Sequence, residues 1–185
     1  MLSNVNSLVL ILIMLLITTI SGNLQAQCNE TAPYTENFDG SDWLPGSGAD
    51  NTGDAIDNCW SRNPGFGTDN FFWGTQTGDT NTLNTGPNAD NTTGSGKFIY
   101  TESNTFSVAG NATFTSPLIN ISGLTNPELR FFYHMYGSGN GIGELRILVD
   151  DGSGFTQQDA IIGQQQGASS APFEERLIDL SSFSG

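Results

Sequence analysis

Short apolar runs separated by clusters of Gly, Asn, Thr and Ser make up the chain from residue 28 onward. Within these runs apolar and polar side chains alternate, and no long apolar stripe recurs with the 3.6-residue period of a helix. Alternation with a period of two places successive side chains on opposite faces of a strand. The pattern predicts an all-β fold, with strands at residues 97–101, 112–118, 129–136, 144–150 and 176–180.

The two most regular runs also indicate which face is apolar. The odd-numbered residues of 129–136 share one face, and those of the run 144–150 share another. The Gly-Ser-Gly-Asn-Gly segment at 137–141 suits a hairpin connection, because glycine readily adopts the positive φ that such loops need. We therefore expect the two runs to form neighbouring antiparallel strands.

The N-terminal segment has a different pattern. Residues 8–17 are all apolar, and the small residue Ala26 follows within ten residues. The apolar run is shorter than the roughly 20 residues that span a bilayer. It predicts a cleaved signal peptide over residues 1–26, followed by one domain over residues 27–185. We expect a secreted or cell-surface protein with no other membrane insertion.

The formal net charge of −14 falls entirely on that domain, because residues 1–27 contain no charged side chain. Phosphate backbones and anionic membrane surfaces repel so acidic a chain. The charge thus argues against nucleic acid as a partner and is compatible with weak attraction for cations.

Cys28 and Cys59 are the only two cysteines. An even number of cysteines in an exported chain indicates a disulfide. The chain has no C-x-x-C motif, so a structural bond is expected rather than a redox site.

The segments that resemble catalytic motifs lack residues that those motifs require. The Gly94-Ser95-Gly96-Lys97 segment has Asn91 and Phe98 where a phosphate-binding loop needs Gly and Ser or Thr. His134 is the sole histidine, and no G-x-S-x-G motif is present. We predict no catalytic residue and a structural role for His134.

Aromatic residues punctuate the turn-rich region 37–90. Trp43, Trp60 and Trp73 are expected to plug the ends of the β-structure, since aromatic side chains bury a large area. The alternative is that one of these rings forms a platform for a ligand, as in a carbohydrate-active jelly roll.

Three blocks of sequence resemble the MAM domain. They are Thr85–Tyr100, which contains Gly86-Pro87 and Asp90-Asn91-Thr92; Leu129–Gly137, which contains Tyr133-His134-Met135; and Gly143–Val149. The resemblance implies an extracellular antiparallel β-sandwich of jelly-roll, concanavalin-like type. It also implies a bond from an N-terminal Cys to one just before a Trp, the position of Cys59.

Departures from the family pattern bear on the type of member. Asn91 replaces a histidine of the family pattern, and Pro127-Glu128 stands where animal members carry another cysteine. These differences are typical of a bacterial-type member. Family members also continue with one or two strands after the run that ends at Leu180, so we expect a C-terminally truncated fragment. The alternative is a degenerate domain that ends naturally.

The resemblance further implies a cation site. Several MAM domains hold a Ca²⁺ or Na⁺ ion with acidic residues from three loops, and the matching positions here are Asp39, Asp69 and Asp90. Carboxylate oxygens suit calcium. The alternative is that these aspartates cap turns, where Asp is common.

The function implied is that of a non-catalytic extracellular binding or adhesion module that contacts protein or glycan. The alternative is an accessory domain of a larger secreted enzyme, such as a peptidase.

Overall fold

A computed structural model describes residues 28–47, 52–65, 71–102, 110–137 and 141–183. The expected signal peptide and Asp69 lie outside these residues. The described residues form ten strands and no helix. The strands are β1 (Asn29–Thr31), β2 (Ser61–Asn63), β3 (Trp73–Thr77), β4 (Lys97–Thr101), β5 (Thr113–Thr115), β6 (Leu118–Asn120), β7 (Glu128–Tyr133), β8 (Glu144–Val149), β9 (Thr156–Ile162) and β10 (Glu174–Asp179).

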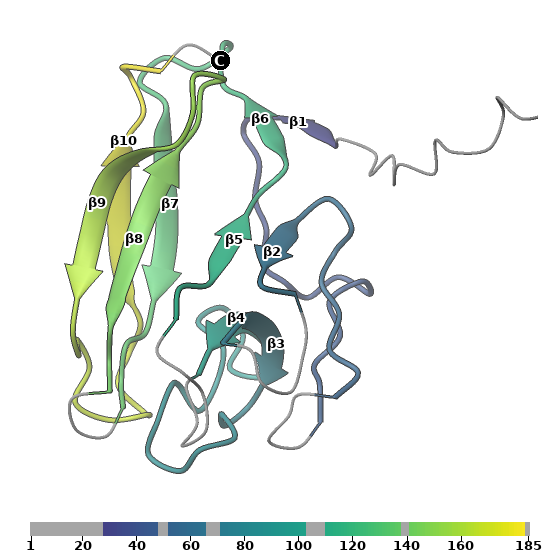
Figure 1. Ribbon diagram of the computed structural model, residues 1–185, viewed down its shortest axis with the longest axis vertical. Coiled ribbons are helices and arrows are strands. Elements are labelled where there is room, and N and C mark those ends of the chain that lie inside the picture. Colours follow the sequence, from purple (N-terminus) through teal and green to yellow (C-terminus); the bar gives the residue numbers. More distant parts are fainter. Residues whose placement is uncertain (1–27, 48–51, 66–70, 103–109, 138–140, 184–185) are drawn as a thin grey trace, which may run out of the picture.

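The strands associate in five pairs. β7 pairs with β10, β8 with β9, β3 with β4 and β2 with β5, all antiparallel, whereas the short β1 and β6 are parallel. The pairs β8–β9 and β7–β10 lie one in front of the other, and the remaining strands lie beside them (Figure 1). This arrangement confirms the all-β class.

The apolar core lies between β8–β9 and β7–β10. Each of the four strands contributes one buried residue to it: Tyr133, Ile147, Ile161 and Ile178. Tyr133 and Ile147 are odd-numbered members of the two alternating runs, so the predicted apolar faces are the buried ones. The two pairs form the layers of a sandwich because each buries one apolar face against the other.

The predicted pairing of residues 129–136 with 144–150 is wrong. Tyr133 of β7 lies opposite Glu174 of β10, and Leu145 of β8 lies opposite Ile161 of β9. β7 and β8 share the core from opposite layers instead of sharing hydrogen bonds. Alternation shows that one face of each strand is buried, but it does not distinguish a neighbour in the same sheet from one in the facing sheet.

Some strand boundaries also differ from the prediction. The run 97–101 coincides with β4, but the run 112–118 is split into β5 and β6 at Ser116-Pro117. Proline has no N–H to donate to a ladder. β7 ends at Tyr133, and beyond it the Met135 carbonyl accepts a hydrogen bond from the Gln165 backbone (2.9 Å). The strands β1, β2, β3 and β9 were not predicted.

The disulfide between Cys28 and Cys59 is confirmed. It attaches the start of β1 to the segment just before Trp60, across 31 positions of sequence. The bond thereby ties the N-terminal strand to the part of the domain that contains Trp60.

The tryptophans pack against one another and against nearby phenylalanines. Trp43 is 1% exposed, and its ring lies 5.0 Å from that of Phe38 and 5.8 Å from that of Trp60. Trp60 stacks on Phe114 at 4.8 Å, and Trp73 lies 5.9 Å from the same ring. The rings form a second packed cluster.

Candidate functional site at the aspartate loops

Asp39 lies in a loop that contacts the first residue of β4. Its Oδ1 accepts a hydrogen bond from the Lys97 backbone N–H at 2.8 Å. The Lys97 ammonium donates in turn to the carbonyl oxygens of Asp39 (3.1 Å) and Gly40 (2.9 Å). Three hydrogen bonds therefore join residues 39–40 to the start of β4.

Asp90 organises the turn that leads into β4. Its Oδ2 accepts from the N–H groups of Thr92 (2.8 Å) and Thr93 (2.7 Å), and its Oδ1 accepts from the Gly96 N–H (2.7 Å) and the Thr93 hydroxyl (3.1 Å). Burial alone would raise the pKa of Asp90, but these donors outweigh it and lower the pKa to about 2. The carboxylate is thus held charged by N–H and O–H groups of its own turn.

Asp39 and Asp90 come close to each other at Gly96. The Gly96 N–H bonds Asp90, and a Cβ added to Gly96 would lie 2.7 Å from Asp39 Oδ1. Only a residue without a side chain allows both contacts. The sequence identified the two aspartates but gave no sign that a glycine six residues after Asp90 would separate them.

The described side chains of this site do not fit a calcium ion. Calcium takes 6–8 oxygen ligands at 2.3–2.6 Å. Both oxygens of Asp90 and Oδ1 of Asp39 already accept protein hydrogen bonds, and the adjacent carbonyls hold the Lys97 ammonium. Among the described residues, no group of three or more His, Cys, Asp or Glu is placed to hold a metal. The hydrogen bonds of Asp90 are those of an aspartate that caps its own turn, whereas Asp39 bonds to the start of a distant strand.

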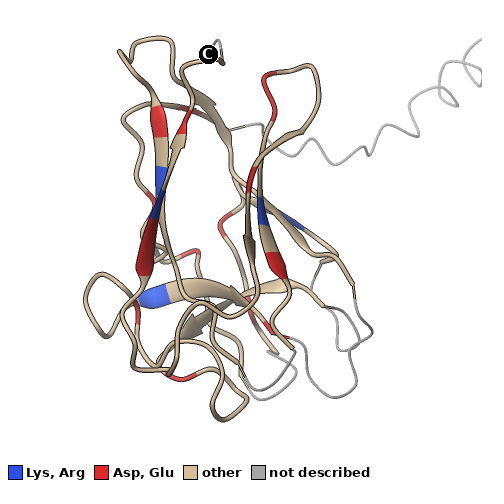
Figure 2. Cartoon of the chain, turned by 90° about the vertical axis from the view of Figure 1, so that its left-hand side faces the viewer, with Lys and Arg blue, Asp and Glu red and all other residues tan. Residues whose placement is uncertain are grey.

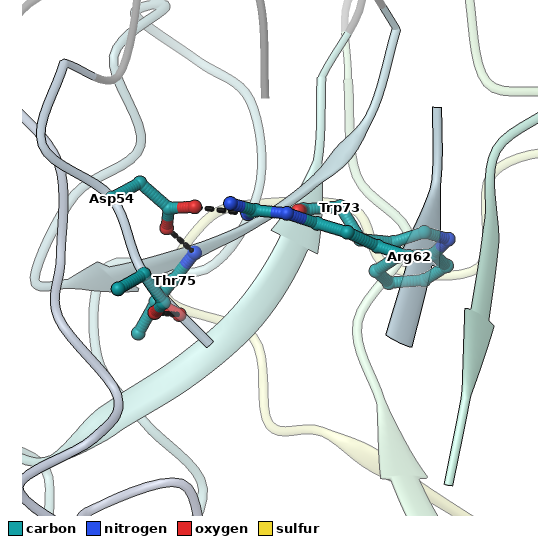
Figure 3. Close-up of polar contacts among 5 residues, drawn as sticks. Asp54, Arg62, Trp73 and Thr75 are labelled. Atoms are coloured by element: carbon teal, nitrogen blue, oxygen red, sulfur yellow. Dashed lines mark hydrogen bonds and ion pairs between the residues drawn. The ribbon is translucent and has the colours of Figure 1, made fainter. Parts of the chain in front are cut away.

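A buried ion pair beside β3 was not predicted. Asp54 has a fully buried side chain and pairs with Arg62 of β2, whose side chain is 10% exposed. Asp54 Oδ1 also accepts from the Thr75 N–H, and Arg62 donates to the Trp73 carbonyl at 2.7 Å (Figure 3). The Arg62 guanidinium lies 5.3 Å from the centre of the Phe72 ring. The network fixes β3 against β2.

His134 has a packing role. Its ring lies 5.4 Å from that of Phe173 and 6.4 Å from that of Tyr136. Both ring nitrogens are buried, and the Ala168 backbone faces the ring without completing a hydrogen bond of normal geometry. Burial lowers the pKa of His134, and Ala168 opposes this only in part.

The outer face of the β7–β10 pair exposes apolar side chains among charges. Phe132 and Leu177 are each 48% exposed. Arg130 on the same face forms ion pairs with Glu128 and Glu175, both at 3.3 Å. At one end of the face lies a hollow of about 360 Å³, lined by Asn126, Pro127, Glu128, Leu177, Asp179 and Ser181.

The basic residues are few and all engaged within the chain. The five Lys and Arg residues all lie in strands, whereas Asp and Glu occupy strands and loops alike (Figure 2). Each arginine forms an ion pair, and Lys97 bonds to the loop carbonyls. The surface charge is therefore negative with little local compensation.

Comparison with known proteins identifies the family. The model of the MAM domain, meprin/A5/mu, matches residues 59–184, so the chain belongs to the MAM family. It is 41% identical over 99 residues to Neuropilin-1a of Danio rerio, which covers 50% of this chain and 10% of that protein. It is 33% identical over 110 residues to MAM domain-containing protein 2 of Homo sapiens, covering 59% of this chain and 15% of that protein. No solved structure matches the chain.

These similarities set the class and compartment of the protein. The relatives are extracellular or cell-surface proteins, and the chain is a secreted or cell-surface protein of the same family. The chain spans only 10–15% of the length of these relatives. They are animal proteins, so they give no support to the bacterial-type assignment. No helix in the part of the chain that the structure describes is long and apolar enough to cross a membrane.

Proposed function

We propose that this chain is a non-catalytic extracellular module that binds a protein partner through the outer face of the β7–β10 pair. The observation that carries the proposal is the exposure of Phe132 and Leu177 on neighbouring strands of that face. Protein interfaces commonly have an apolar centre with an aromatic anchor, surrounded by polar residues. Glu128, Glu175 and Asp179 supply such a rim.

Charge indicates the chemistry of the partner. Among the described residues of β7 and β10 on this face, Arg130 is the only basic one beside Glu128, Glu175 and Asp179, and it already pairs with two of them. A partner surface with apolar residues ringed by Lys or Arg would complement it. The tryptophans favour protein over glycan, because they pack in the aromatic cluster. The same surface would serve an accessory domain of a secreted enzyme.

A binding screen with paired variants tests the proposal. The secreted chain would be assayed against a panel of purified extracellular proteins and against a glycan array. In the test variant Phe132→Ser and Leu177→Ser are combined, and the control combines Leu148→Ser with Ile162→Ser, which are exposed on the outer face of β8–β9. We expect binding to a protein that the test variant loses, that the control keeps and that weakens with salt. Glycan binding, or protein binding that only the control variant loses, would contradict the proposal.

A further inference from the structure

Lys97 is the only lysine in the chain, and it begins β4 beside the loop that contains Asp39. Both ends of the residue bond to this loop. The backbone N–H donates to the Asp39 carboxylate, and the ammonium donates to the carbonyls of Asp39 and Gly40. The two partners are 58 positions apart in the sequence, so the contact is a tertiary one.

The two backbone carbonyls that accept from this ammonium are oxygen groups of the kind that bind a hard cation. Calcium takes backbone carbonyls as well as carboxylates as ligands. An ammonium group is a compact positive charge with three donors. Two of these donors are already directed at carbonyl oxygens of the loop. An added divalent ion would have to displace them and would meet the charge of Lys97.

Asp90 also has no carboxylate oxygen without a protein hydrogen bond. The Asp90 oxygens accept from Thr92, Thr93 and Gly96. Both oxygens of Asp90 and Oδ1 of Asp39 are thus engaged by protein donors.

We propose that the ammonium of Lys97 supplies the positive charge at the contact between the Asp39 loop and β4, and that it holds this loop on β4 without calcium. The inference is independent of which surface binds a partner. It predicts that the loop–strand junction depends on the positive charge at residue 97 and is insensitive to chelators.

Thermal unfolding of the full secreted chain tests the inference. The melting temperature of the wild-type protein is expected to be the same in EDTA and in millimolar CaCl₂, and calorimetric titration is expected to show no calcium heat. Lys97→Met keeps most of the aliphatic stem and removes the charge, so it should lower the melting temperature. Lys97→Arg keeps the charge and should lower it less. Arg146→Met is the matched control, since it removes one positive charge from an exposed ion pair with Glu144.

A chemical measurement covers the case in which Lys97→Met does not fold. Lys97 carries the only side-chain amine, so an acetylating reagent reports on it alone once the α-amine is discounted. We expect Lys97 to react many times more slowly in the folded wild-type chain than in urea. Equal reaction rates, a Lys97→Met variant as stable as Arg146→Met, or a wild-type melting temperature that calcium raises with one-to-one binding would each overturn the inference.

Discussion

Asp54 and Arg62 form an ion pair that is almost completely removed from solvent and connects the loop before β2 to β3. The pair does not stand alone, because Asp54 also accepts from the Thr75 N–H and Arg62 donates to the Trp73 carbonyl (Figure 3). Buried charges are tolerated only when each is paired and further hydrogen-bonded. Both conditions are met here, so the network positions β3 and the adjoining aromatic cluster.

Asp54→Ala should strongly destabilise the domain. It would leave the Arg62 guanidinium buried without its counter-ion and the Thr75 N–H without an acceptor, and losses of this kind cost about 3–5 kcal/mol. Urea unfolding followed by tryptophan fluorescence measures the change. Glu144→Ala, which breaks the exposed pair with Arg146, is the control and should have a much smaller effect. Equal effects of the two substitutions would show that the buried pair contributes no more than a surface one.

Asp90→Asn should lower stability at neutral pH and reduce the loss of stability in acid. The pKa of Asp90 is lowered from 3.8 to about 2 in the folded chain, so its contribution is full above pH 4 and is lost as the pH falls toward 2. A shift of this size corresponds to about 2 kcal/mol. Unfolding free energies of the two proteins at pH 7 and at pH 2–4 check this. Asp151→Asn, at an exposed turn, is the control, and a curve for Asp90→Asn parallel to that of the wild type would contradict the prediction.

The chain should become less stable as the pH falls below about 6.5, the ordinary pKa of histidine. Burial lowers the pKa of His134, so the unfolded chain takes up its proton first and is favoured as the solution is acidified. His134 is the only histidine, which makes His134→Gln a direct comparison. Melting temperatures between pH 7.5 and 5 should fall more steeply for the wild type than for this variant. Identical slopes would assign the pH dependence to other groups.

Reduction of the Cys28–Cys59 bond should destabilise the domain by about 3–4 kcal/mol, the value expected for closing a loop of this length. The described cysteines form this one bond and none is free, so a reducing agent acts at a single site. Urea unfolding with and without reductant measures the difference. The double variant Cys28→Ala and Cys59→Ala should unfold as the reduced protein does and should not respond to reductant.

Much of the β-structure could be predicted from local pattern. The run 97–101 matches β4, and the apolar faces of β7 and β8 were assigned correctly from their odd-numbered residues. The pairing of those two strands could not be predicted, because burial of one face is compatible with a partner in either layer. β1 and β2 are three residues long, too short for alternation to be visible.

The candidate site, too, was predicted only in part. The family resemblance singled out Asp39 and Asp90, and both lie beside Gly96. The hydrogen bonds from N–H groups to these aspartates and the contacts of Lys97 were not predicted. The reason is that a sequence does not show which side chain accepts from a given backbone N–H. Asp54 and Arg62 have no local signal either, because their burial depends on β3 packing over them.

The sequence by itself determined the all-β class, the apolar faces, the disulfide and membership of the MAM family. These depend on alternation, on a count of two cysteines and on motifs whose spacing lies along the chain. Only the tertiary structure decided that β7 faces β8 across the core, and that Lys97 reaches the carbonyls of Asp39 and Gly40. The physical reason is that pairing and charge compensation depend on which distant segments meet, and that is set by packing of the whole domain.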